Sequence, residues 1–142
     1  MSTISFFASS EKVPAFSRKY FRQGITALVM AKKKKVGDIS YIFCTDEELL
    51  SINKKYLNHN TYTDIITFDY TDGVISGDIF ISVERVRENS RKFEVAFKQE
   101  LLRVMVHGVL HLLGLKDKTD AESKRMRTAE DKAMKKYLAE FH

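Results

Sequence analysis

The sequence contains little cysteine, proline or glycine, and each shortage excludes a class of structure. The single cysteine, Cys44, excludes an intramolecular disulfide and a zinc cluster built from several thiolates. One proline and six scattered glycines leave no stretch with the composition of an interdomain linker. We therefore expect one domain over residues 1–142, in which the 44% of hydrophobic residues suffice for a single core.

Long apolar runs are absent as well. No segment approaches the roughly 20 consecutive apolar residues that a membrane-spanning helix needs, and residues 1–13 lack the pattern of a signal peptide. We therefore expect a cytoplasmic protein without a membrane partner. The 24 Lys and Arg against 19 Asp and Glu give a net charge of +5, which permits a polyanionic partner such as nucleic acid without specifying one.

Hydrophobic periodicity predicts an α+β fold, with a small mixed β-sheet of three or four strands packed with about five helices. Strand and helix patterns both occur, and they do not alternate regularly as βαβ units. The turn signal Thr71-Asp72-Gly73 allows the last two strands to form a hairpin. The candidate strands cover residues 4–8, 39–44, 64–70 and 78–82.

Helices are expected where apolar residues recur at helical spacing beside capping signals. Pro14 suits the first turn of the first helix, and the run Lys32–Lys35 suits its end, where cations complement the helix dipole. Two further helices are expected to begin at capping boxes, formed by Thr45 with Glu48 and by Thr119 with Glu122. Another is expected from near Val83, and a long one from about residue 95 to about residue 113.

The helix expected at about residues 95–113 contains two histidines, His107 and His111. Residues four apart lie on one face of a helix, about 6 Å apart, so the two imidazoles can bind one ion. Gly114 follows where a helix can end in a left-handed conformation, after which the chain can fold back and bring Asp117 to the imidazoles. The pattern predicts a metal site of His107, His111 and Asp117 at the end of a central apolar helix, with one zinc ion as the preferred occupant.

The same spacing occurs in the H-E-x-x-H-x-x-G-x-x-H pattern of metzincin proteases, with Asp in place of the last His. Those proteases place a general-base Glu directly after the first His, where this sequence has Gly108, so we do not expect peptidase activity. Two alternatives remain for the histidines. They are polar residues hydrogen-bonded to neighbours within an apolar helix, or they belong to a two-His, one-carboxylate iron site.

The segment 107–114, HGVLHLLG, resembles the H-G-x-L-H-L-x-G-Y-D-H signature of the YbeY family of zinc-dependent single-strand endoribonucleases linked to ribosomal RNA maturation. Residues 53–56 and 63–68 resemble the family's N-x-x-Y and T-D-V-L-S-F segments, and residues 77–82 resemble its G-D-I-x-I-S strand. The resemblance implies a zinc-dependent endoribonuclease that hydrolyses phosphodiester bonds in ribosomal RNA processing. Its implied partners are single-stranded RNA, ribosomal RNA foremost, and the ribosome or its small-subunit precursor.

Three positions depart from the family pattern. Asp117 replaces the third His and follows Lys116 instead of Asp, Leu57 replaces an Arg, and Tyr62 replaces a Pro. A carboxylate at position 117 keeps a ligand but lowers the net charge of the site by one, which makes the metal a weaker Lewis acid. Leu57 removes a phosphate-binding donor. His59 either replaces that donor or is a solvated loop histidine.

Zinc with three protein ligands lowers the pKa of a bound water toward ~7, and the metal can also polarise a phosphoryl oxygen. No residue beside His107 is an obvious general base. Arg103, one turn before His107, either contacts phosphate or forms a structural ion pair. Glu100, about 10 Å from His107 along the helix, is too distant to be a direct ligand.

We expect RNA to be held through its phosphates, so that its affinity falls steeply with salt. An alternative function is a ribosome-associated RNA-binding assembly factor with a structural or weakly catalytic metal, which Leu57 and Asp117 favour. The expected phosphate contacts come from basic residues near the metal cleft and from the basic face of the last helix: Lys124, Arg125, Arg127, Lys132, Lys135 and Lys136.

Overall fold

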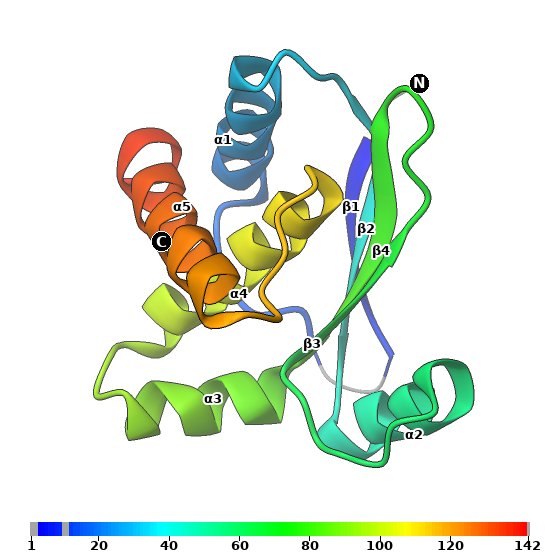
Figure 1. The fold of residues 1–142 in the computed structure, drawn as a ribbon. Helices are drawn as coiled ribbons and strands as arrows, with labels where there is room; N and C mark the ends of the chain where they lie inside the picture. Colours follow the sequence, from blue (N-terminus) through cyan, green and yellow to red (C-terminus); the bar gives the residue numbers. More distant parts are fainter. Residues whose placement is uncertain (1–2, 10–11, 142) are drawn as a thin grey trace.

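The computed structural model describes residues 3–9 and 12–141, and it confirms the predicted α+β fold. In this part of the chain, five helices pack with one mixed sheet of four strands (Figure 1). No helix in the same ranges is long and apolar enough to span a membrane. The strands are β1 (Thr3–Ala8), β2 (Val36–Cys44), β3 (Ile65–Asp69) and β4 (Ile75–Ser82).

The sheet has the strand order β1-β2-β4-β3. β2 pairs in parallel with both β1 and β4, whereas β3 pairs antiparallel with β4. The predicted hairpin is therefore present, although β4 begins at Ile75 and not at Asp78. Side chains alternate along β4 between buried and half-buried positions, as expected for a strand with one face on the core.

The helices begin and end close to their sequence signals. Both predicted capping boxes are formed, at Thr45 and at Thr119. The prediction for Pro14 is wrong, because the first helix begins only at Arg18, where the Ser17 side chain accepts a hydrogen bond from the Tyr20 backbone N–H. The helices are α1 (Arg18–Ala31), α2 (Asp46–Leu57), α3 (Val83–Lys92), α4 (Phe97–Leu112) and α5 (Asp120–Tyr137).

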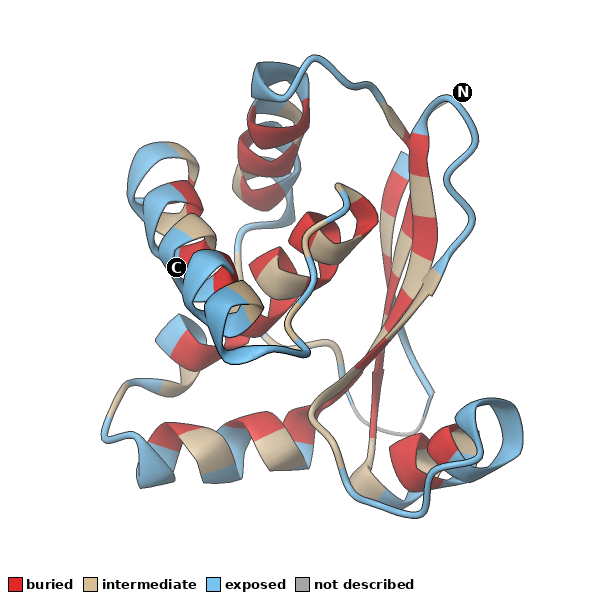
Figure 2. Cartoon of the chain, viewed as in Figure 1, coloured by how far each residue is buried: buried red, intermediate tan, exposed pale blue. Residues whose placement is uncertain are grey.

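Helix α4 lies at the centre of the fold, between the sheet and α5 (Figure 1), and most of its residues are buried (Figure 2). The buried Tyr41 hydroxyl of β2 donates to the Met105 carbonyl at 2.8 Å, which joins α4 to the sheet. A Cβ added to Gly108 would lie 2.9 Å from two side-chain carbons of Ile79 on β4. Gly108 thus allows α4 to approach the sheet closely, which fixes the height of His107 and His111 above it.

Candidate metal centre

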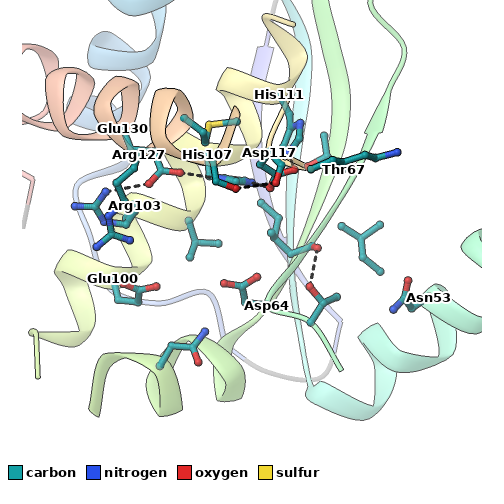
Figure 3. A pocket seen from close by; sticks show the side chains of 18 of the residues that line it. Asn53, Asp64, Thr67, Glu100, Arg103, His107, His111, Asp117, Arg127 and Glu130 are labelled. Atoms are coloured by element: carbon teal, nitrogen blue, oxygen red, sulfur yellow. Dashed lines mark hydrogen bonds and ion pairs between the residues drawn. The ribbon is translucent and has the colours of Figure 1, made fainter. Parts of the chain in front are cut away.

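The three predicted ligands lie together near the C-terminal end of α4 (Figure 3). Nε2 of His107 lies 3.2 Å from Oδ2 of Asp117, and Nε2 of His111 lies 3.4 Å from Oδ1 of the same carboxylate. The two imidazole centroids are 4.7 Å apart, as expected for residues one turn apart on a helix. The side chains are 19%, 30% and 37% exposed in the order His107, His111 and Asp117, so all three are partly accessible to solvent.

The turn after α4 brings Asp117 to the histidines. Gly114 adopts φ +102°, a conformation that residues with a Cβ rarely take. Its N–H donates to the His111 carbonyl at 2.9 Å, and the Leu115 N–H donates to the Leu110 carbonyl at 3.0 Å. The Ser123 hydroxyl of α5 then donates to the Asp117 carbonyl at 2.9 Å, so both ends of the loop are held.

The donor atoms of this group fit a divalent metal. One ligand atom from each residue can be chosen so that all three lie within 4.8 Å of one another. Zinc bonds of about 2.0–2.1 Å in a tetrahedral arrangement separate neighbouring ligand atoms by about 3.3 Å. The N–O distances of 3.2 and 3.4 Å are close to that separation, and they end on the two different oxygens of the Asp117 carboxylate. Two imidazoles and a carboxylate also suit zinc chemically.

Glu130 of α5, whose role was not predicted from the sequence, contacts Nδ1, the other ring nitrogen of His107. Its buried carboxylate lies 2.6 Å from His107 Nδ1 and accepts a hydrogen bond of 2.9 Å from Arg103. Because an ionised carboxylate only accepts hydrogen bonds, Nδ1 carries the proton of a neutral His107, and Nε2 keeps a lone pair directed toward Asp117. One sequence signal pointed to Glu130, since it is an acid on the otherwise apolar stripe of α5 that contains Met126 and Ala133.

Arg103 is an ion-pair residue in this structure. Besides Glu130, its guanidinium binds Asp131 at 2.6 Å. Of the two interpretations raised by the sequence, the structural ion pair is therefore the observed one. Its effect on the site passes through Glu130, whose orientation it fixes.

Electrostatics around His107 favour a charged ring in the absence of a metal. Burial works to lower the pKa of His107, but the hydrogen bond and charge of Glu130, followed by the charges of Asp117 and Asp64, raise it overall. A divalent cation that bonds Nε2 replaces that positive charge among the same carboxylates. The ring therefore lies in surroundings suited to a cation.

Two further carboxyl groups face the pocket beneath the ligand group, Asp64 just before β3 and Glu100 in the first turn of α4 (Figure 3). Burial raises the pKa of Asp64, partly offset by the charge of His107. Burial also raises the pKa of Glu100, and the negative charge of Asp64 raises it further. Groups with raised pKa values in a cleft are candidates for proton transfer. Asp64 thus supplies a candidate base that the sequence analysis had not named.

The ligands open into a pocket of about 1030 Å³ between β3, α4 and α5. Leu57 and the exposed His59 line its far side, together with Asn53, whose side chain donates to the Thr61 carbonyl at 2.8 Å. His59 is therefore part of the same cleft as the three candidate ligands. The pocket lies at the upper end of the volumes usual for ligand sites, which suits an extended substrate.

The basic face predicted for the last helix does not border this pocket as a whole. Of its six residues, only Arg127 lines the metal pocket, beside Met126 and Glu130. Most of this face therefore cannot contact a phosphate bound beside the candidate metal centre, because opposite sides of α5 line different cavities. A second pocket is lined by Lys124, Arg125, Lys132 and Lys136.

Comparisons with known proteins agree with the fold and indicate the family. A family model described as "Endoribonuclease YbeY" matches residues 4–138. A relative from Flavobacterium johnsoniae named "Endoribonuclease YbeY" is 52% identical over 123 residues, which is 86% of this chain and 86% of the relative. One of the same name from Parabacteroides distasonis is 46% identical over 92% of this chain and 93% of its own. The solution structure of a Thermotoga maritima protein shares the fold, with a TM-score of 0.65, 21% identity, and 96% and 93% of the two chains covered.

Proposed function

Since the chain belongs to the YbeY family, we propose that it is a zinc-dependent endoribonuclease that hydrolyses phosphodiester bonds of single-stranded RNA. Ribosomal RNA is the proposed substrate, met in the cytoplasm on the ribosome or its small-subunit precursor, and the chain acts as one domain over residues 1–142. The observation that carries the proposal is the convergence of His107, His111 and Asp117 in a large open pocket.

The three residues would hold one Zn²⁺, which would supply Lewis-acid activation of water and of a phosphoryl oxygen. His107 would bind through Nε2, because Glu130 holds its Nδ1 at 2.6 Å. The remaining side of the site opens toward solvent, where the substrate enters. A ligand set of two imidazole nitrogens and one carboxylate oxygen also disfavours ions that prefer thiolate ligands, such as Cu(I).

Residues of the pocket provide the other requirements of the reaction. Asp64 is the proposed proton acceptor, because it is a partly buried carboxyl group in the same pocket as the ligands. Lys118 and Arg127 lie in the pocket wall and offer positive charge to phosphates. His59, from the α2–β3 loop, lines the same pocket and offers a further donor, two residues after Leu57, which stands where the family pattern has an Arg.

Cleavage of an end-labelled single-stranded ribosomal RNA fragment tests the proposal. The purified protein is depleted of metal, reloaded with Zn²⁺, and compared with His111→Ala and with Gln99→Ala, a substitution at an exposed position of the same helix. Cleavage is expected from the zinc-loaded wild type and Gln99→Ala only, and chelator should abolish it. Binding to the same fragment should weaken steeply as salt rises from low to physiological concentration.

An RNA-binding assembly factor with a structural or weakly catalytic metal is the second candidate. The observation that favours it is Leu57, an exposed apolar residue of the pocket wall in the position where the family pattern has an Arg. RNA binding that survives both chelation and His111→Ala, with intact RNA recovered from the zinc-loaded wild type, would establish this factor in place of the nuclease.

A further inference from the structure

A second cavity of about 640 Å³ lies on the side of α5 away from the candidate metal centre, between α5, α1 and the end of α4. Its floor is aliphatic, with Leu28 and Leu110 buried beneath Leu115 and Ala129. We call this cavity the α1–α5 groove. It is lined by Leu28, Ala31, Lys32, Leu110, Leu115, Lys124, Arg125, Thr128, Ala129, Lys132, Ala133, Lys136 and Tyr137.

The rim of the groove carries charge of one sign. Five of the lining residues are Lys or Arg, and none is Asp or Glu. Across the described ranges 3–9 and 12–141, none of these five cations makes an ion pair, whereas Arg85 and Arg103 each pair with acids. The cations are Lys32 at the end of α1 and Lys124, Arg125, Lys132 and Lys136 on α5.

Such a rim does not stabilise the fold. Like charges one turn apart on a helix, such as Lys132 and Lys136, repel each other, whereas the floor already packs in the core and leaves only the half-buried Leu115 and Ala129 at its surface. A cationic rim around an apolar floor does fit a ligand that is both acidic and apolar. Gly24 of α1 approaches α5 so closely that a Cβ there would lie 2.6 Å from the Tyr137 carbonyl oxygen, so the groove walls are held before any ligand arrives.

The groove is separate from the metal pocket. The two cavities share no lining residue. Met126, Arg127 and Glu130 face the metal pocket, while Arg125, Ala129 and Lys132 face the groove, and the two sets occupy opposite sides of α5 at 100° per residue. A ligand of the groove therefore does not compete with a substrate at His107.

We propose that the α1–α5 groove binds an acidic amphipathic helix of a partner protein. Between Lys124 and Lys136 the rim extends for about 18 Å, or roughly three helical turns. Apolar residues at helical spacing would contact Leu115 and Ala129, and flanking acids would pair with the rim. The floor favours a protein over single-stranded RNA, because Tyr137 is the only ring in the groove lining and RNA-binding platforms stack bases on aromatic rings.

A synthetic peptide tests the proposal on the full chain. The probe has about 14 residues, roughly four helical turns, with Leu at helical spacing and Glu on both flanks. Two matched peptides replace every Glu by Gln or scramble the order of the same residues. Each peptide is titrated into the ¹⁵N-labelled protein, and the chemical shifts of the backbone amides are monitored by NMR. The acidic amphipathic peptide should bind with micromolar affinity, and the shift changes should be confined to α1, α5 and Leu115.

Charge reversal identifies the binding surface. Lys132→Glu combined with Lys136→Glu should weaken the peptide about tenfold, whereas Lys54→Glu with Lys55→Glu on the exposed side of α2 should not. Lys132→Gln with Lys136→Gln serves as a milder pair, and circular dichroism checks that each variant is folded. Equal binding of all three peptides, no binding, or shifts outside the groove would overturn the proposal. So would an oligouridine that binds there while the peptide does not, since the groove would then be an RNA surface.

Discussion

Glu130 is the residue on which the orientation of His107 depends. It is buried, lies 2.6 Å from Nδ1 of the ring, and is held in turn by Arg103. A carboxylate in this position fixes the tautomer and the direction of a metal-binding imidazole. The hydrogen bond therefore prepares Nε2 for a metal before the metal arrives.

Replacing Glu130 by Gln is expected to weaken zinc binding about 10- to 100-fold, the usual effect of losing such a partner. Competition with a chromophoric chelator measures the affinity. The matched control is Asp131→Asn, because Asp131 is an exposed neighbour that reaches the network only through Arg103. Because Glu130 raises the pKa of His107, the ¹⁵N shifts of this ring in metal-free protein should show that it loses its proton at lower pH in Glu130→Gln but not in Asp131→Asn. Equal zinc affinity of wild type and Glu130→Gln would refute the positioning role.

Asp117 is the residue at which the sequence leaves the family pattern, and its side chain is the most exposed of the three candidate ligands. Asp117→Ala should leave two imidazoles and weaken zinc binding substantially, whereas Asp117→His should retain the metal. Because His is neutral, the second change also leaves more of the ion's charge uncompensated, so any hydrolytic pH profile should move to lower pH. The same chelator competition decides this, and undiminished zinc affinity in Asp117→Ala would show that the carboxylate is not a ligand.

Glu100 is expected to make folding depend on pH. Burial, followed by the charge of Asp64, raises its pKa in the folded chain, so the folded state binds the proton more tightly than the unfolded state does. Its contribution to stability is therefore greatest in acid and is lost as pH rises through the folded-state pKa. Glu100→Gln cannot ionise, so the metal-free variant should be more stable than wild type at pH 8 and lose this advantage toward pH 4. Urea unfolding measures this, with exposed Glu140→Gln as control. An equal difference at both pH values would contradict it.

Helix α4 shows what sequence patterns capture at the scale of one element. Its amphipathic spacing and the following glycine predict that His107, His111 and Asp117 converge, as they do in the structure, because helix geometry is local and the Gly114 turn needs only a short loop. Glu130 was missed because its role arises only when α5 packs against α4. The strand order was likewise not predictable, since parallel pairing of β2 with β4 joins segments separated by α2 and β3.

Gly108 was interpreted from the sequence only as the lack of a general base, whereas the structure gives it a packing role. Gly108→Ala would place a methyl group 2.9 Å from two carbons of Ile79. Overpacking of this kind destabilises a core by about 1–3 kcal/mol. The higher helix propensity of Ala than of Gly stabilises the folded state by about 1 kcal/mol. The free energy of unfolding should therefore fall by about 0–2 kcal/mol in denaturant titration.

Coupling to Ile79 tests that explanation. Ile79→Val removes one of the two carbons that a methyl group at position 108 would meet, and alone it costs about 0.5–1.5 kcal/mol. If the contact causes the loss, the double variant is more stable than the sum of the single changes predicts. Strict additivity would place the cause elsewhere.

Across the whole molecule, α5 separates two surfaces of different character. One face completes the metal pocket with Arg127 and Glu130, and the other provides most of the rim of the α1–α5 groove. The net charge of +5 is therefore not spread evenly around one RNA-binding site. Four of the six basic residues of α5 face away from the metal centre, and this distribution permits a nuclease site and a protein-binding site to be occupied together.

The metal centre joins α4, the following loop and, through Glu130, α5, so metal binding should stabilise the fold as a whole. A ligand that binds only the folded state adds about 2.7 kcal/mol at a free concentration one hundred times its Kd. For a domain of this size that corresponds to a rise in Tm of roughly 8 °C. Calorimetry of metal-free protein with and without Zn²⁺ measures it. His107→Ala and His111→Ala should show no such rise, whereas Lys132→Gln with Lys136→Gln, in the α1–α5 groove, should keep it in full. A wild-type Tm unchanged by zinc would count against the three-residue site, because a bound ion cannot leave the stability of its folded host unaltered.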